Sequence, residues 1–363
     1  MQLALEQGRR ALGWSSPNPA VGAGVVRDGE VVGAGRTQPP GGDHAEVGAL
    51  REAGDRARGA TVFVTLEPCA HTGRTPPCTS TLIEAGVAAV RYAIGDPDPN
   101  VSGAGRRVLE DAGIAVEDGD GATEVAAQLE GYLHQRRTGR PFVVVKYAAS
   151  LDGRIAASSG DSRWVSGPQT LEWAHEQRQR LDAIVVGSGT VVVDDPELTA
   201  RPGGSTEGAH QPLRVVADSR GRTPDGARVL AGDSPTLIAT TAASPEDWRE
   251  RMAARGAELL VLPEAGGHVD LEALIRALGD RGALTVLFEG GGVLLGSLFD
   301  ARLVDRVQAV IAPVVIGADV APAAVAGRGV ERMAQAPRLR DLSVTQLGED
   351  TLISGLPAWP GEP

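Results

Sequence analysis

Two stretches decide the fold of the first half of the chain: His44-Ala45-Glu46, and the longer run Glu67-Pro68-Cys69-Ala70-His71-Thr72-Gly73-Arg74-Thr75-Pro76-Pro77-Cys78. His44, Cys69 and Cys78 offer one imidazole and two thiols, the nitrogen and sulfur donors that tetrahedral zinc prefers. Three protein ligands leave one position open, which is typical of a catalytic zinc whose bound water ionises near neutral pH. Glu46 is the nearby carboxylate that this chemistry needs for proton transfer. The pattern therefore predicts a catalytic zinc site with Glu46 as its acid and base.

The spacing of the two cysteines leaves alternatives open. Zinc deaminases carry H-x-E followed by P-C-x-x-C, whereas Cys78 comes nine residues after Cys69. A purely structural zinc would need a fourth ligand, for which His71 is the nearby candidate, and a single buried His or Cys is more often a packing residue. Both segments open a helix, so we expect His44 and Cys78 near helix N-termini, where partial positive charge favours a thiolate.

Composition narrows the range of partners. The 363 residues include 47 acidic and 35 basic side chains, and the formal net charge of −12 disfavours a nucleic-acid partner and favours a small-molecule substrate. No apolar signal-peptide core follows Arg9 and Arg10, and no run of about 18 apolar residues occurs, so we expect no membrane association. We therefore expect a cytoplasmic location, where Cys69 and Cys78, the only two cysteines, stay reduced and are available to a metal.

The length and the hydrophobic content of 42% fit two domains. In the first, residues 1–138, we expect a hairpin around Asp28-Gly29 and then alternating helices and strands. The expected strands are 20–27, 30–35, 61–66 and 87–94, and the expected helices lie near 2–13, after Asp43, from Cys78, near 103–113 and near 123–137. Residues 139–141 are the expected linker.

The second domain, residues 142–358, restarts with an apolar strand at 142–147. Further strands are expected at 183–187, 213–217, 236–241, 284–289 and 307–315, with helices at 168–180, 246–255 and 270–280. Strands that alternate with helices predict a mainly parallel sheet covered by helices. The run from Glu289 to Gly296 predicts a strand-to-helix turn whose backbone amides can approach a phosphate, although glycine runs also make ordinary turns. The chain has no G-x-G-x-x-G, so a Rossmann fingerprint is not expected.

The whole chain resembles the bifunctional deaminase-reductase family of riboflavin biosynthesis. In the first half the resemblance rests on Pro17-Asn18-Pro19-Ala20-Val21-Gly22, His44-Ala45-Glu46 and the 67–78 run, whose long cysteine spacing is this family's own pattern. In the second half it rests on the segments 146–156, 162–166, 189–199, 217–219 and 288–292. The resemblance implies a cytidine-deaminase-like α/β/α domain followed by a dihydrofolate-reductase-like α/β domain.

The resemblance also implies two reactions. The first is zinc-dependent deamination of 2,5-diamino-6-(5-phosphoribosylamino)pyrimidin-4(3H)-one, and the second is NADPH-dependent reduction of its ribosyl group to ribityl. A homo-oligomer is the implied assembly. In the deaminase pocket the resemblance places Asn18, His71, Arg74 and Asp96 at the substrate. Thr37 and Asp98 stand where the family commonly has histidine and asparagine, so we expect details of substrate recognition to differ there.

For the reductase the resemblance implies a cofactor set and a substrate set. Expected NADPH contacts are Ala148, Trp164, Thr190, Asp194, Ser219 and the run from Gly291 and Gly292 to Ser297. Expected substrate contacts are Lys146, Ser162, Arg178, Leu198, Arg201 and Glu289. The two arginines suit a ribose phosphate because guanidinium groups donate two hydrogen bonds to one anion. Hydride transfer to the sugar also needs a charged or acidic group nearby, and Lys146, Asp194 and Glu289 are equal candidates at this point.

Two other functions fit parts of the pattern. A nucleoside or tRNA base deaminase with an unrelated appended domain would share the zinc motif, but the negative charge and the aromatic content of 3% oppose it. A non-enzymatic, zinc-stabilised regulatory protein would need neither Glu46 nor the reductase motifs.

Overall fold

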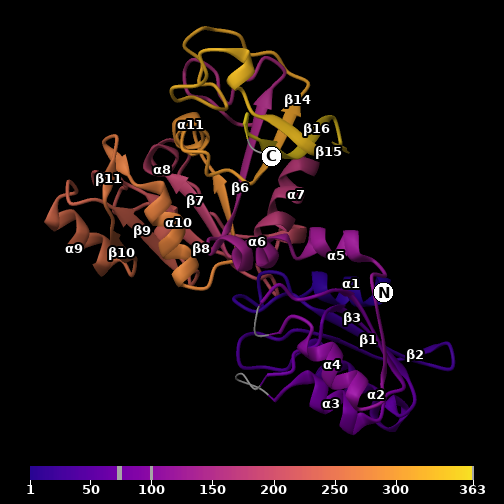
Figure 1. Cartoon of the computed structure of the whole chain (residues 1–363). Helices are drawn as coiled ribbons and strands as arrows, with labels where there is room; N and C mark the ends of the chain where they lie inside the picture. The colour runs from indigo at the N-terminus through magenta and orange to yellow at the C-terminus, as the bar shows by residue number, and fades with distance from the viewer. Residues whose placement is uncertain (72–75, 99–100, 362–363) are drawn as a thin grey trace. The chain divides into compact units, whose positions relative to one another are not determined.

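The computed structural model describes residues 1–71, 76–98 and 101–361, and it divides into two compact units, Met1–Arg140 and Pro141–Pro363 (Figure 1). Each unit has its own sheet with helices packed on it. Within the described ranges, no helix is long and apolar enough to cross a membrane.

A five-stranded sheet in the order β2-β1-β3-β4-β5 forms the centre of the first unit. β1 (Gly22–Arg27) and β2 (Glu30–Arg36) make the expected hairpin, and Asp28 and Gly29 have φ values of 52° and 84°, as a two-residue hairpin turn requires. β1 is antiparallel to β3 (Thr61–Leu66), whereas β3, β4 (Ala89–Ile94) and β5 (Ala115–Asp118) are parallel. The carboxyl ends of β3 and β4 therefore share one edge of the sheet, just before Cys69 and Asp96.

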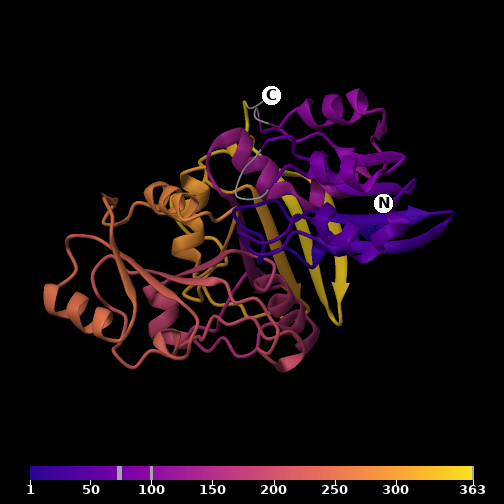
Figure 2. The same ribbon diagram turned by 90° about the horizontal axis from the view of Figure 1, so that it is seen from below.

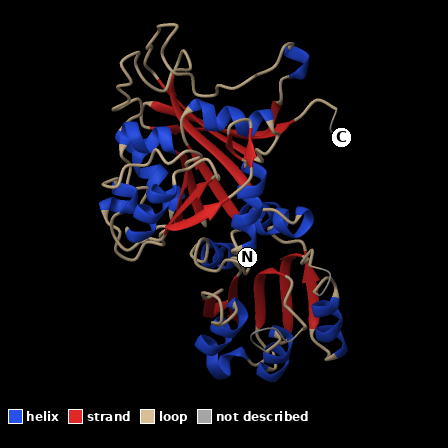
Figure 3. Ribbon diagram, turned by 90° about the vertical axis from the view of Figure 1, so that its left-hand side faces the viewer, coloured by secondary structure: helices blue, strands red, loops and turns tan. Residues whose placement is uncertain are grey.

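Helices cover both faces of this sheet, with α2, α3 and α4 on one side and α1 and α5 on the other (Figures 1 and 3). The helices are α1 (Gln2–Arg9), α2 (Ala45–Ala53), α3 (Cys78–Ala85), α4 (Ala104–Asp111), α5 (Ala122–Gln128) and α6 (Glu130–Thr138). α2 lies directly on β2 because Gly33 and Gly35 have no side chain: a Cβ at either would lie 2.2 Å from a carbonyl oxygen of α2. This close approach fixes the first turn of α2, which carries Glu46.

A nine-stranded sheet in the order β10-β9-β8-β7-β13-β6-β14-β16-β15 forms the second unit. The seven strands from β10 to β14 in this order are parallel, and β16 and β15 continue the sheet antiparallel beside β14 (Figure 2). The strands are β6 (Phe142–Ser150), β7 (Ala183–Gly187), β8 (Leu213–Ala217), β9 (Thr236–Thr240), β10 (Glu258–Val261), β13 (Thr285–Glu289), β14 (Arg306–Ala312), β15 (Arg338–Leu347) and β16 (Asp350–Ala358). A small separate hairpin joins β11 (Glu264–Ala265) and β12 (His268–Val269).

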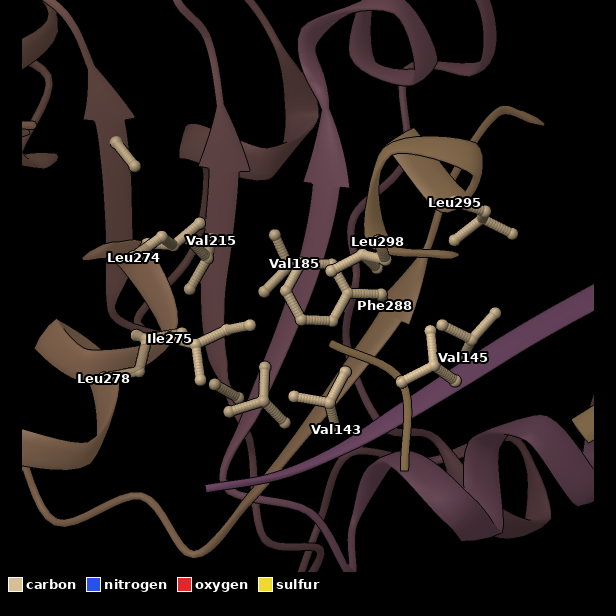
Figure 4. Close-up of a cluster of buried hydrophobic side chains, with 14 of the residues drawn as sticks. Val143, Val145, Val185, Val215, Leu274, Ile275, Leu278, Phe288, Leu295 and Leu298 are labelled. Carbon is tan, nitrogen blue, oxygen red and sulfur yellow. The ribbon is translucent and has the colours of Figure 1, made fainter. Parts of the chain in front are cut away.

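Both faces of the parallel part are buried. Val143 and Val145 of β6 pack with Phe288 and Leu274 in the core shown in Figure 4, whereas Val144 between them belongs to the core on the opposite face. Successive residues of a strand point to opposite faces, so an unbroken apolar run such as 142–145 marks a strand buried on both. The helices are α7 (Pro168–Arg178), α8 (Ser188–Asp194), α9 (Glu246–Ala254), α10 (Leu271–Asp280) and α11 (Gly292–Asp300).

The predicted α/β architecture of both halves is confirmed, and the differences lie at element ends and sheet edges. The helix expected at 2–13 ends at Arg9, before a run of turns that includes Gly13 at φ 78°. The helix expected at 123–137 is divided at Leu129, whose backbone is not helical at φ −96° and ψ 15°. The strand expected at 307–315 ends at Ala312. β5, β10 and β15 were not predicted, because their exposed residues interrupt the apolar pattern. β16 was not predicted either, although none of its residues is exposed, because Asp350, Ser354 and Pro357 interrupt its apolar sequence.

Candidate active sites

Three metal-binding side chains converge at the carboxyl edge of the first sheet. His44 is the N-cap of α2, Cys78 is the first residue of α3, and Cys69 lies in the loop after β3. His44 Nδ1 lies 3.1 Å from Cys78 Sγ and 3.6 Å from Cys69 Sγ, and the three potential ligand atoms lie within 4.8 Å of one another. One imidazole and two thiols at these separations are a donor set that fits zinc.

The surroundings of the two thiols favour one thiolate. The pKa of Cys69 is lowered to about 4, chiefly by a hydrogen bond from the Cys78 thiol and also by His44, against the opposing effect of burial. The backbone N–H of Cys78 also donates to Cys69 Sγ at 3.4 Å. The pKa of Cys78 is raised in turn, because its thiol is the donor in this pair and because it is buried. The Cys69 thiolate thus lies beside the His44 imidazole and the first residue of α3, an arrangement that suits a bound cation.

Glu46 lies in the first turn of α2, two residues after His44, and its residue is only 4% exposed. Burial raises the pKa of Glu46, and the nearby Cys69 thiolate adds to this effect. A carboxyl group with a raised pKa can both accept and return a proton near neutral pH. The structure thus places a buried carboxyl group beside the three metal-binding side chains.

A cavity of about 310 Å³ opens over this cluster. Its wall includes most of the side chains that the sequence indicated for the deaminase: Asn18, Thr37, His44, Glu46, Cys69, His71, Asp96 and Asp98. Arg74, which the resemblance places in the same pocket, lies outside the described residues. Thr37 is buried, and its hydroxyl donates to the Val21 carbonyl and accepts from the Val21 amide, so this departure from the family pattern is used for backbone contacts.

Three further side chains of the cavity wall, Glu67, Tyr132 and Arg136, were missed by the sequence reasoning. The Glu67 carboxylate accepts hydrogen bonds from the backbone amides of Gly103 and Arg106 and so anchors the start of α4. Tyr132 and Arg136 come from α6, far along the chain from the zinc motif, and no local pattern marked them. One signal was available for Glu67, since it directly precedes Pro68-Cys69.

Tyr132 holds the buried carboxylate of Asp96. Its hydroxyl lies 3.0 Å from both Asp96 oxygens, and the Asp98 amide donates to the same carboxylate at 2.9 Å. Burial raises the pKa of Asp96, whereas the hydrogen bonds from Asp98 and Tyr132 act in the opposite direction. The Arg136 guanidinium lies 4.9 Å from the centre of the Tyr132 ring, and its Nε is 3.7 Å from Asp98 Oδ2.

Replacing Tyr132 by phenylalanine should therefore weaken deamination. Loss of one hydrogen bond to a buried carboxylate costs roughly 1–2 kcal/mol, so we expect kcat/KM for deamination to fall about tenfold. The loss should be larger toward acid pH, because the pKa of Asp96 rises further without the Tyr132 hydroxyl. Tyr92→Phe is the matched control, since Tyr92 is a buried tyrosine of β4. A Tyr132→Phe enzyme with an unchanged pH profile would contradict this role for the hydroxyl.

In the second unit, Lys146 and Glu289 lie side by side on the neighbouring parallel strands β6 and β13. Arg178 of α7 reaches Glu289 with two hydrogen bonds, Nη2 to Oε2 at 2.6 Å and Nε to Oε1 at 3.4 Å. Burial opposes ionisation of Glu289, but Arg178 and Lys146 outweigh it and hold the pKa at about 2. The pKa of Lys146 is lowered, mainly by burial.

Lys146 is also the only lysine among the 35 basic residues of the chain, all the others being arginine. Arginine keeps its charge at every physiological pH, whereas a lysine amine can lose its proton. Lysine at this one half-buried position, in a chain that has arginine at every other basic position, favours a role for a titratable amine there. This signal was present in the sequence but was not used to rank the three candidates.

The other residues expected at the reductase site fall into local groups. Ser162 donates to Asp194 at 3.1 Å, and Arg163 donates to the Asp194 carbonyl at 2.7 Å. Thr190 lies on α8, Ala148 lies on β6, and Trp164 is 71% exposed. Leu198 is buried in a left-handed backbone conformation with φ 56°. Arg201 forms an ion pair with Glu197.

The glycine-rich turn after β13 lies next to the turn after β7: an added Cβ at Gly290 would be 3.8 Å from the Gly187 amide. α11 begins at Gly292 with Gly291 as its N-cap, and no side chain caps its first amides. Such an end at the carboxyl edge of a parallel sheet fits a phosphate of a dinucleotide. Gly292 also has a packing role, because a Cβ there would lie 2.3 Å from the Ala323 carbonyl. Ser219, after β8, accepts the Val269 amide.

Comparisons with known proteins match both units. A family model described as the RibD C-terminal domain matches residues 141–353, and one described as the cytidine and deoxycytidylate deaminase zinc-binding region matches residues 1–94. The chain is 39% identical to riboflavin biosynthesis protein RibD of Escherichia coli over 362 residues, which cover 97% of each protein. It is 43% identical to the protein of that name from Mycobacterium tuberculosis over 356 residues, covering 98% of this chain and 95% of the relative.

Solved structures give the same result. Acinetobacter baumannii RibD superposes with a TM-score of 0.87 at 37% identity, covering 98% of this chain and 97% of the other. The Thermotoga maritima diaminohydroxyphosphoribosylaminopyrimidine deaminase/5-amino-6-(5-phosphoribosylamino)uracil reductase superposes with a TM-score of 0.84 at 31% identity, covering 99% and 97%.

Proposed function

Since the chain belongs to the RibD family of bifunctional riboflavin-biosynthesis enzymes, we propose which of its own side chains carry each of the two reactions. The enzyme hydrolytically deaminates 2,5-diamino-6-(5-phosphoribosylamino)pyrimidin-4(3H)-one and then reduces the ribosyl group of the product to ribityl. Residues 1–138 perform the first reaction and 142–358 the second, with 139–141 as the linker. The observation that carries the proposal is the presence of both side-chain sets, His44/Cys69/Cys78/Glu46 and Lys146/Arg178/Glu289, in one chain.

In the deaminase unit, His44, Cys69 and Cys78 hold the zinc of this family. When bound, zinc lowers the pKa of water at the open position. Glu46 would take one proton from that water and deliver it to the ring nitrogen as the hydroxyl adds to the carbon, and it would then carry a second proton, from the added hydroxyl, to the amino group, which leaves as ammonia. Its burial and raised pKa suit both halves of this transfer. Asn18, His71, Arg74 and Asp96 position the pyrimidine and its phosphoribosyl group.

In the reductase unit, the NADPH is held by seven residues: Ala148, Trp164, Thr190, Asp194, Ser219, Gly291 and Gly292. NADPH supplies the hydride that is added to the sugar carbon. The substrate of this unit is held by Ser162, Arg178, Leu198, Arg201, Lys146 and Glu289.

The three candidates for assisting hydride transfer now differ. Glu289 is fixed as a carboxylate by Arg178, since its pKa is about 2, and so it has no proton to give near neutral pH. Asp194 is engaged by Ser162 through its side chain and by Arg163 through its carbonyl. Lys146 has a lowered pKa, and the Glu289 carboxylate lies opposite it on the neighbouring strand. We assign Lys146 as the donor of the proton that accompanies the hydride, with Glu289 as its partner.

The experiment that tests the function follows product mass. With the diamino substrate alone, the purified protein should convert it to a product heavier by about one mass unit, because an amino group is replaced by a hydroxyl group. Addition of NADPH should then add about two mass units and oxidise an equal amount of NADPH. An unchanged mass under both conditions would refute the function, and a change under only one would leave a single active unit.

The remaining proposals concern partners and location. We propose a cytoplasmic homo-oligomer that acts on small phosphorylated molecules and not on nucleic acids. The net charge of −12 supports the last point, because a polyanion would be repelled. The homo-oligomer rests on the family resemblance, and light scattering of the purified protein measures it directly.

A further inference from the structure

One face of α7 holds the loop that carries Arg201. Glu172, His175 and Arg178 are spaced by three residues and so lie on the same side of the helix. Glu172 Oε1 accepts the Gly203 amide at 2.6 Å, and Arg178 Nη1 donates to the Thr199 carbonyl at 3.3 Å. His175 lies between these two contacts.

The contacts of His175 involve a single ring nitrogen. Its Nδ1 lies 3.3 Å from the Arg201 amide and 3.1 Å from the Thr199 carbonyl oxygen. A neutral imidazole nitrogen is either a donor or an acceptor, so Nδ1 can serve only one of these groups at a time. The Thr199 carbonyl already accepts a hydrogen bond from Arg178, so it does not depend on His175. For the Arg201 amide, His175 Nδ1 is the acceptor among the described residues. Both the Thr199 carbonyl and the Arg201 amide therefore have a hydrogen-bond partner if Nδ1 accepts from the Arg201 amide and Nε2 carries the proton of the ring.

The charges around the ring favour this neutral form. Burial lowers the pKa of His175, and the guanidinium groups of Arg178 and Arg201 lower it further. A neutral ring keeps the Nδ1 lone pair available to the Arg201 amide. The loop is also held from the other side, since the Gln211 side chain pairs with both the amide and the carbonyl of Ala200. Loss of the His175 contact should thus shift Arg201 without releasing the whole loop.

We propose that His175 is a positioning residue of the reductase, whose Nδ1 fixes the backbone of Arg201 so that the Arg201 and Arg178 side chains face the same substrate anion. His175 itself touches neither substrate nor cofactor in this assignment. The inference rests on the proposed function, in which Arg178 and Arg201 bind the phosphorylated substrate. A hydrogen bond from the Arg201 amide to an acceptor on α7 explains how this helix and a separate loop can supply one anion site.

Two substitutions separate this role from simple packing. His175→Leu fills the volume without an acceptor, and His175→Asn keeps an acceptor oxygen close to the position of Nδ1. We expect His175→Leu to raise the KM for the deaminated substrate about tenfold, the effect of one lost hydrogen bond, with kcat and the KM for NADPH within about twofold. His175→Asn should restore the substrate KM to within about threefold. His268→Ala, at an exposed histidine of β12, is the control and should change none of these values.

The deaminase activity of the same variants reports on the integrity of the chain, and it should stay constant. A normal substrate KM in His175→Leu would overturn the inference, and so would an Asn variant as impaired as the Leu variant. Arg201→Ala distinguishes the inference from its premise. If Arg201→Ala raises the substrate KM and His175→Leu does not, His175 has no positioning role. If neither raises it, the assignment of Arg201 to the substrate fails.

Discussion

Glu46→Gln should abolish deamination while the zinc and the reductase remain. Glutamine has nearly the same shape as glutamate and can accept a hydrogen bond, but it cannot carry a proton from water to the ring nitrogen. Glu46 is buried and stands beside the metal-binding cluster, so the substitution removes the carboxyl group that adjoins the metal-binding side chains. General acid-base catalysis contributes about 10²–10⁴-fold, so we expect kcat to fall by roughly 10³-fold or more. Single-turnover mass spectrometry of the product measures this loss.

Two further measurements on the same variant and one control variant make the assignment specific. The metal content should remain near that of the parent enzyme, since the ligands are His44, Cys69 and Cys78. Reduction of the separately supplied aminouracil should be unchanged. Glu84→Gln is the control, because Glu84 is exposed on α3, the helix that starts with Cys78. Loss of zinc in Glu46→Gln would show that Glu46 is a ligand, and retention of deamination would show that another group moves the proton.

The zinc cluster could be predicted from sequence because its parts are local. Each of its segments is a loop that opens a helix, so His44 and Cys78 occupy helix starts whatever the distant contacts are. Glu46 could be predicted as well, because it stands two residues after His44 in the His44-Ala45-Glu46 motif. Tyr132 could not be predicted in this way, since it meets Asp96 only after α6 packs near the cavity. A contact between residues 36 positions apart leaves no periodic trace in either segment.

In the second half, the six central parallel strands were predicted, whereas the edge strands β10 and β15 and the antiparallel strand β16 were not. β7 and the first four residues of β6 are apolar on both faces, and an apolar run of this kind is readily recognised as a strand. β15 is an edge strand with mostly exposed residues, so its composition does not distinguish it from a loop. The Arg178 and Glu289 pair joins a helix and a strand 111 residues apart, and only the fold shows that Arg178 keeps Glu289 ionised.

Lys146→Met should abolish reduction and spare deamination. When the hydride adds to the carbon of the open-chain imine of the sugar, the imine nitrogen takes up a proton. We expect the Lys146 ammonium to supply that proton. Methionine keeps the length and apolar stem of the side chain but carries no proton. We expect the reductase kcat to fall by roughly 10²–10⁴-fold, the usual contribution of a general acid. NADPH oxidation in the presence of the deaminated substrate measures the rate.

Lys146→Arg separates the proton from the charge. Arginine preserves the positive charge beside Glu289 but does not release a proton at neutral pH, so we expect a loss of kcat close to that of Lys146→Met. Activity of the parent enzyme should fall as the pH rises through the pKa of Lys146. Because burial lowers that pKa, this basic limb should lie below 10.5, the ordinary value for lysine. An Arg variant within a few-fold of the parent would contradict proton donation and leave Lys146 only an electrostatic role. Lys146 is the only lysine in a chain whose other basic residues are all arginine. This favours a large loss of kcat in Lys146→Arg, since arginine would have supplied the positive charge equally well.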